Sequence, residues 1–138
     1  MTSPKTLRFS ILSLALLAAL ITSRIVAEDA APQPEDQRVK SVLEQSLKTD
    51  PNNSALWAHL GFADNKLNDV DGAQTAFEKA AALNPQNVDA LYMLGLIYEK
   101  KKMTNEALKA WNSVLAISEE KWRRDVAGKH IHHLKSNE

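Results

Sequence analysis

Two glycines, Gly61 and Gly95, lie at the same place in two matching stretches of sequence. Small and apolar residues recur at helical spacing around both of them. The matching residues are Trp57, Leu60, Ala73, Phe77 and Ala80 in the first stretch, and Leu91, Leu94, Ala107, Trp111 and Val114 in the second. A glycine inside a helix costs about 1 kcal/mol relative to alanine. Two glycines at equal phase therefore indicate that pairs of helices approach each other closely at these points.

The 34-residue frame resembles the tetratricopeptide repeat (TPR), a helix–turn–helix unit with the pattern W-x-x-L-G-x-x-Y…A-x-x-x-F…P. The resemblance implies an all-α fold, a TPR-type α-solenoid with full repeats at residues 54–87 and 88–121. Pro85 closes the first repeat, because proline ends a helix. We expect antiparallel helices and no sheet; the helices are predicted near residues 36–49, 54–67, 70–83, 88–101, 104–117 and 120–134.

Partial units flank the two full repeats. The frame shifted back by one period includes Val39 and Leu43, so residues 36–53 are predicted to hold the second helix of a half-repeat. The region before it contains Pro32 and lacks a helical pattern, which leaves the first helix missing or replaced. Residues 120–138 are predicted to be a C-terminal cap helix and tail, which hide the last apolar face of such arrays. The N-terminal edge needs a cover, either a partner protein or a second copy.

The N-terminal segment, residues 1–27, differs in character from the rest of the chain. Lys5 and Arg8 precede an apolar run that ends at Ile21, and Ala27 is a suitable cleavage point for a signal peptidase. This layout is typical of a secretory signal. We therefore expect residues 1–27 to be a signal peptide.

An uncleaved N-terminal membrane anchor is the alternative for the same segment. A spanning helix needs about 20 apolar residues, and membrane contact would then run only through residues 9–23. Residues 28–35 are predicted to form a short linker. The expected location is the periplasm or the outer face of the inner membrane, with secretion and mitochondrial import as alternatives.

Composition narrows the classes of partner. The chain carries 17 basic and 17 acidic residues, and removal of residues 1–27 would leave a net charge of −3. Such a product has no electrostatic reason to bind nucleic acid. The chain has no cysteine, which excludes disulfides, thiol catalysis and covalent haem attachment.

A search for chemistry yields no catalytic residues and no cofactor motif. His130, His132 and His133 form a cluster, but on a helix only His130 and His133 would share a face. No carboxylate lies near them at metal-ligand spacing in the sequence. We interpret the cluster as surface histidines or a polar cap face and predict no metal site, with a metal-binding protein as the weaker alternative.

The resemblance implies a concave groove lined by the first helix of each repeat. Carried over to this sequence, the groove residues are Ala58, His59, Phe62, Asn65, Tyr92, Met93, Leu96 and Glu99. The paired lysine and asparagine with which some TPR proteins hold a carboxylate are absent at these positions. An apolar and aromatic surface with a polar rim fits apolar side chains of a partner.

Two readings of the groove stay open. The first is a non-catalytic interaction scaffold or adaptor that acts outside the cytoplasm and binds a protein or peptide partner. The second is a self-assembling structural module, a homo-oligomer whose groove and N-terminal edge are covered by another copy of the chain.

Overall fold

The computed structural model describes residues 34–136, and residues 1–33 and 137–138 lie outside the described part. The predicted signal segment therefore falls outside the description. The described residues form helices alone: α2 (Pro34–Thr49), α3 (Ser54–Lys66), α4 (Val70–Leu83), α5 (Val88–Lys100), α6 (Thr104–Ile117) and α7 (Lys121–Ser136). The all-α prediction with six helices in this region is confirmed. No helix in this part of the chain is long and apolar enough to cross a membrane.

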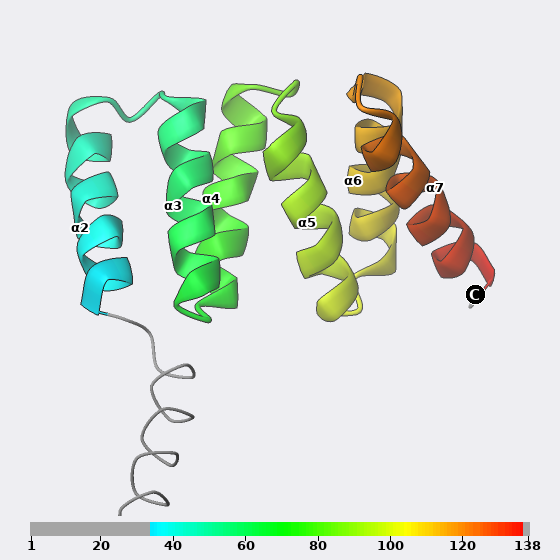
Figure 1. Cartoon of the computed structure of the whole chain (residues 1–138), viewed down its shortest axis with the longest axis horizontal. Coiled ribbons are helices and arrows are strands. Elements are labelled where there is room, and N and C mark those ends of the chain that lie inside the picture. The colour runs from blue at the N-terminus through cyan, green and yellow to red at the C-terminus, as the bar shows by residue number, and fades with distance from the viewer. Residues whose placement is uncertain (1–33, 137–138) are drawn as a thin grey trace, which may run out of the picture. The chain divides into compact units, whose positions relative to one another are not determined.

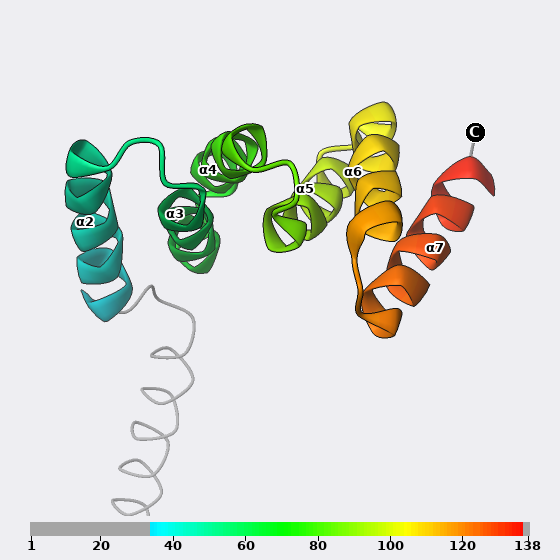
Figure 2. The same cartoon turned by 90° about the horizontal axis from the view of Figure 1, so that it is seen from above.

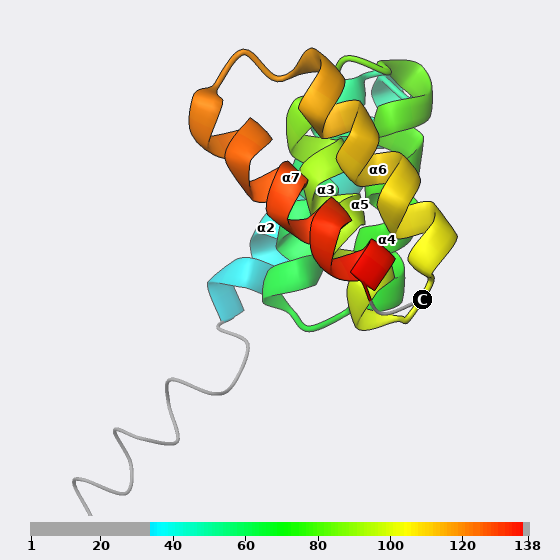
Figure 3. The same cartoon turned by 90° about the vertical axis from the view of Figure 1, so that its right-hand side faces the viewer.

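The helices follow one another in chain order from α2 to α7 (Figure 1). The hairpins α3–α4 and α5–α6 are the two full repeats, α2 is the half-repeat and α7 is the cap. Each helix packs on its neighbours in the chain, and α3 also touches α5. From above, α4 is set off from its neighbours α3 and α5 (Figure 2), and from the end α7 runs beside α6 and in front of α5 (Figure 3).

Polar side chains cap the start of three helices. The side chain of Asn53 accepts hydrogen bonds from the backbone N–H groups of Ala55 and Leu56, and Asp69 and Asn87 do the same for α4 and α5. These caps satisfy amide groups that have no partner inside the helix.

Helix α2 begins at Pro34, two residues earlier than predicted, so the last two residues of the predicted linker 28–35 are helical. Proline suits the first turn of a helix because its fixed φ matches helical geometry and its missing N–H would have no partner there. Glu35 and Asp36 follow in that turn, where their negative charges interact favourably with the positive end of the helix dipole.

The glycines lie where the two helices of each hairpin are closest. A Cβ atom on Gly61 would stand 2.8 Å from the ring of Phe77, and one on Gly95 would stand 2.6 Å from the ring of Trp111. Both rings are fully buried. Glycine is therefore favoured at both helical positions, because a side chain there would occupy the space of the aromatic ring.

The buried side chains form three clusters along the row of helices. The first joins α2 to repeat 1 and contains Leu47, Leu60 and Ala76. The second joins the two repeats and contains Ala58, Ala73, Phe77, Ala80, Ala90, Leu94, Ile97 and Ala110. The third joins repeat 2 to the cap and contains Ala107, Trp111, Val114 and Ala127. The core is therefore distributed along the array, as expected of stacked repeats.

A buried ion pair holds α2 against repeat 1. The Nζ atom of Lys40 lies 2.6 Å from Oδ1 of Asp64, whose side chain is almost fully buried, and 3.4 Å from Oδ2 of Asp69. The carboxylate of Asp64 raises the pKa of Lys40, against the effect of burial. The pKa of Asp69 is lowered, chiefly by the hydrogen bond from the backbone of Gly72. Removal of Lys40 would leave Asp64 as an unpaired buried charge.

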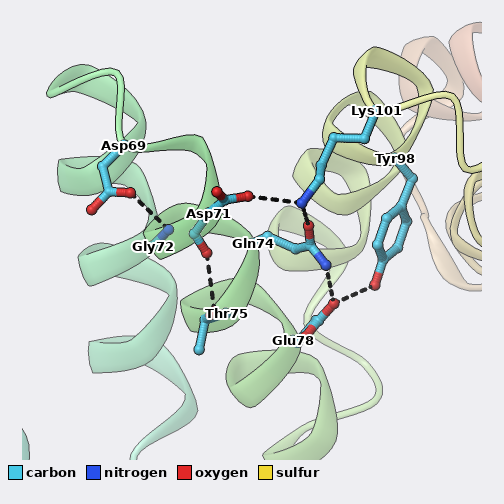
Figure 4. Close-up of polar contacts among 8 residues, drawn as sticks. All are labelled: Asp69, Asp71, Gly72, Gln74, Thr75, Glu78, Tyr98 and Lys101. Carbon is cyan, nitrogen blue, oxygen red and sulfur yellow. Dashed lines mark hydrogen bonds and ion pairs between the residues drawn. The ribbon is translucent and has the colours of Figure 1, made fainter.

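A polar network joins α4 to α5 (Figure 4). The hydroxyl of Tyr98 donates to Glu78 at 2.9 Å, and Lys101 contacts Asp71 at 2.8 Å and Gln74 at 2.6 Å. Burial raises the pKa of Tyr98, and the carboxylate of Glu78 raises it further. Lys101, which the sequence places at a helix end, thus also links the second repeat to the first.

The close contact predicts the effect of a single methyl group. Gly95→Ala should lower the free energy of unfolding by about 1–3 kcal/mol, because the Trp111 ring must move to accept it. Helix propensity alone would raise stability by about 1 kcal/mol. Gly128→Ala is the matched control, since nothing lies within 4 Å of a Cβ at that helical glycine. Urea unfolding followed by circular dichroism measures both, and a Gly95→Ala protein more stable than the parent would contradict the packing argument.

Candidate functional site

The first helices of the two repeats, α3 and α5, carry the predicted groove residues. Phe62 and Leu96 occupy equivalent positions of the two repeats, and both large apolar side chains are exposed. His59 and Asn65 are also exposed on α3. These four residues present side chains that a partner could contact.

One predicted groove residue belongs to the interior, and a second is partly covered. Ala58 is buried in the core cluster that joins the two repeats. Met93 packs against the same cluster but is only half-buried. Ala58 is therefore closed to a partner, whereas Met93 keeps part of its surface open.

Tyr92 is shared between the interior and the surface. Its ring meets the edge of Trp111 at a centroid distance of 5.2 Å and lies 6.0 Å from the ring of Trp122 on α7. Tyr92 therefore helps to seat the cap helix, so its truncation would disturb packing as well as any bound partner.

Glu99 is held by residues of α6 and α7. The carboxylate accepts a hydrogen bond from the indole N–H of Trp111, and Nδ1 of His130 lies 2.7 Å from the same oxygen. The ring of His130 stacks on that of Trp111 with centroids 4.4 Å apart and an angle of 17° between planes. We name Glu99, Trp111 and His130 the cap joint, because they connect α5, α6 and α7.

The histidine cluster is accordingly divided. His130 is half-buried in the cap joint, whereas the side chains of His132 and His133 are exposed. A cavity of about 370 Å³ lies beside the joint, lined by Glu99, Lys129, His130 and His133. Within residues 34–136, no group of three histidine, cysteine or acidic side chains could hold a metal ion. His130 contacts Glu99, which lies 31 residues earlier in the chain and on a different helix. The spacing of residues within one helix could therefore not predict this contact.

A pocket between α2 and α3 adds residues that the sequence did not assign to the groove. Its volume is about 290 Å³; it is lined by Asp36, Val39, Leu43, His59, Phe62, Ala63 and Lys66. Lys66 and Asp36 form an ion pair at 3.4 Å on its rim. The α2 residues were missed because the resemblance places the groove on first helices only, although the frame itself contains Val39 and Leu43.

Trp122 is a further surface residue that the sequence analysis missed. It is the most exposed aromatic side chain in the described part of the chain, and the guanidinium of Arg123 lies 5.2 Å from its ring centre. Arg123 also pairs with Asp89 on α5 at 2.7 Å. A lone tryptophan in a predicted polar cap was the available signal, because such a large apolar side chain is unusual on a solvated face.

Comparison with protein families identifies the repeats. Two family models described as tetratricopeptide repeat match residues 54–87 and residues 76–109. The first match coincides with the first full repeat, and the second runs from α4 through α5 into α6. Residues 54–109 are therefore similar to tetratricopeptide repeats.

Two curated relatives show the same repeats in much longer proteins. Tetratricopeptide repeat protein 37 of Xenopus laevis is 34% identical over 74 residues, which are 54% of this chain and 5% of the relative. Superkiller complex protein 3 of Mus musculus is 34% identical over 79 residues, which are 57% of this chain and again 5% of the relative. The chain thus spans about a twentieth of the length of these relatives.

A solved structure supports the fold. The TPR domain of Sgt2 from Aspergillus fumigatus superposes with a TM-score of 0.57 and 18% sequence identity, over 78% of this chain and 81% of that domain. The fold is a TPR-type α-solenoid, with two full repeats, a preceding half-repeat and a C-terminal cap helix.

The cap joint predicts a loss of stability on removal of its carboxylate. Glu99→Ala should lower the free energy of unfolding by about 1–3 kcal/mol, because the fully buried indole of Trp111 loses its acceptor. Glu119→Ala, at an exposed glutamate after α6, is the control and should change little. Thermal unfolding followed by tryptophan fluorescence measures both, and equal stability of the two variants would show that the joint contributes nothing.

Proposed function

We propose that this chain is a non-catalytic interaction scaffold that acts outside the cytoplasm and binds a protein or peptide partner along its first helices. TPR domains generally bind protein or peptide partners, and TPR proteins are generally scaffolds without catalytic activity. The described site contributes apolar contact surface and hydrogen-bonding groups, which suit binding.

One observation carries the proposal. Phe62 and Leu96, at equivalent positions of α3 and α5, are large apolar side chains that are 38% and 36% exposed. Together with Trp122, at 53%, they place one exposed apolar side chain on each of α3, α5 and α7. We name Phe62 and Leu96 the groove row. Aromatic and aliphatic anchors of this kind carry most of the energy in protein interfaces.

The polar side chains near the groove row define the class of partner. His59 and Asn65 on α3 are exposed and supply hydrogen-bonding groups beside Phe62. The carboxylate of Glu99, by contrast, is already in contact with the indole N–H of Trp111 and with Nδ1 of His130. The partner segment proposed here therefore carries apolar side chains toward the groove row and makes polar contacts chiefly on the α3 side.

The test truncates the two exposed side chains of the groove row. Phe62→Ala with Leu96→Ala should lower partner retention at least tenfold in a pull-down from the native extract, because each anchor typically contributes about 1–4 kcal/mol. Leu83→Ala with Leu115→Ala is the matched control, since these leucines are 39% and 40% exposed on the second helices α4 and α6. Circular dichroism checks folding, because the Phe62 ring also contacts Phe77 at a centroid distance of 5.0 Å.

The two pairs of substitutions separate the outcomes. Loss of the partner with the groove pair and retention with the control pair support the proposal. Retention with both pairs, or loss with the control pair alone, overturns it. A variant with all three C-terminal histidines replaced by alanine is read only after its stability has been measured, because His130 belongs to the cap joint.

The proposed location rests on residues 1–27, which combine basic residues, an apolar run and a cleavage point. The proposal places the protein in the periplasm or at the outer face of the inner membrane. If residues 9–23 remain, they anchor it there.

A fusion tests export directly. Residues 1–35 joined to a reporter that is active only outside the cytoplasm should confer activity, because a basic and then apolar N-terminus directs translocation. A reporter joined to residues 36–138 alone is the control and should stay inactive. N-terminal sequencing of the full chain should give a start near Glu28 if cleavage occurs. Full-length protein that is found only in the cytoplasm would contradict the proposed location.

A further inference from the structure

Helix α2 exposes apolar residues at positions that are buried in both full repeats. Val39 and Val42 are 44% and 64% exposed. The equivalent positions one and two repeats later are alanines that are at most 5% exposed: Ala73, Ala76, Ala107 and Ala110. We name Val39, Val42 and Leu43 the open face of α2, since Leu43 is the equivalent of the fully buried Phe77.

In the full repeats, the position that would cover the open face of α2 is occupied by a helix. In the full repeats, the equivalent residues of α4 and α6 lie against α3 and α5, the first helices of the same hairpins. The half-repeat has a second helix without a first helix before it among the described residues. The pocket of about 290 Å³ between α2 and α3 borders this vacant position, because Val39 and Leu43 line it.

The tight turn that joins the helices of each full repeat cannot form directly before α2. In both full hairpins the turn contains one residue in the left-handed region, Asn68 with φ of 61° and Lys102 with φ of 59°. The residue in the same register before α2 is Pro34. The proline ring fixes φ at a negative value, so this turn cannot form there.

From these observations we infer that the open face of α2 pairs with the open face of α2 in a second copy of the chain, in antiparallel orientation. The two helices of a TPR hairpin are also antiparallel, so each α2 takes the place of the missing first helix for the other. A two-fold arrangement covers both open faces at once and closes the assembly.

The charges at the ends of α2 suit the antiparallel orientation. Glu35 and Asp36 lie in the first turn, where Asp36 already pairs with Lys66 of α3, and Lys48 lies in the last turn. Antiparallel pairing brings Glu35 of each copy toward Lys48 of the other and opposes the two helix dipoles. Val42 lies at the middle of this 16-residue helix, so the two-fold axis passes close to it.

The other end of the array does not offer an equal partner. On α7 the exposed side chains are polar or charged apart from Trp122. A head-to-tail contact would therefore place the apolar face of α2 against a polar helix and would leave an open chain of copies. The pairing of α2 with α2 avoids both.

The first test measures self-association of the protein expressed from the full 138-residue sequence and purified after any processing by the cell. Sedimentation velocity over a concentration series should show a monomer–dimer equilibrium. Val42→Glu should weaken it at least tenfold, because it places two like charges at the two-fold axis. Ser41→Glu is the matched control: this exposed residue lies about 100° around the helix from Val42 and should leave the equilibrium unchanged.

The second test uses the absence of native cysteine. Val42→Cys should give a disulfide-linked dimer on mild oxidation, whereas Ser41→Cys should not. A monomer at all concentrations overturns the inference, and so does equal cross-linking at the two positions. If residues 1–33 cover the open face, the pure protein should be monomeric and Val42 should be inaccessible. If a different protein covers it, the pure protein should be monomeric and Val42 should be accessible. Either result also overturns the inference.

The inference does not depend on the proposed scaffold function, and the two fail separately. Leu96→Ala alone should leave the dimer intact, because Leu96 does not line the pocket that Phe62 shares with Val39 and Leu43, and Val42→Glu should leave partner capture by the groove row intact. A dimer lost only in the Leu96→Ala variant would overturn the assignment to α2.

Discussion

The contact between a glycine and a buried aromatic ring organises both repeats. Gly61 and Gly95 let Phe77 and Trp111 fill the hairpins completely. Trp111 does more than fill its hairpin, because its N–H group binds Glu99, its face stacks on His130 and its edge meets Tyr92. The cap helix is therefore positioned by the same ring that requires the glycine.

The interfaces between successive units use different polar chemistry at one equivalent position. Asp64 pairs with Lys40 where α2 meets α3, and Tyr98, at the same position of the next repeat, donates to Glu78 where α4 meets α5. The stacking geometry thus accommodates either an ion pair or a hydrogen bond from a hydroxyl group to a carboxylate at this position.

The sequence predicted features that depend on local spacing and missed those that depend on distant side chains. Helix bounds and the glycine contacts follow from a repeat period that a single chain displays in full. Burial of Ala58 depends on how closely α3 approaches α5, and the role of Glu99 depends on His130 from the cap. Neither is encoded in the spacing within one helix, so half of the predicted groove could not be separated from the interior.

The division of the core into three clusters has a consequence for dynamics. Each cluster spans one junction between neighbouring units, and none unites the whole array. Opening of α2 breaks the smallest cluster and the ion pairs of Lys40 with Asp64 and Asp69 and of Asp36 with Lys66, while both glycine contacts persist. Amide protons should therefore exchange with solvent in order from the ends toward α4 and α5, so the molecule responds to stress as a gradient and not as a single cooperative block.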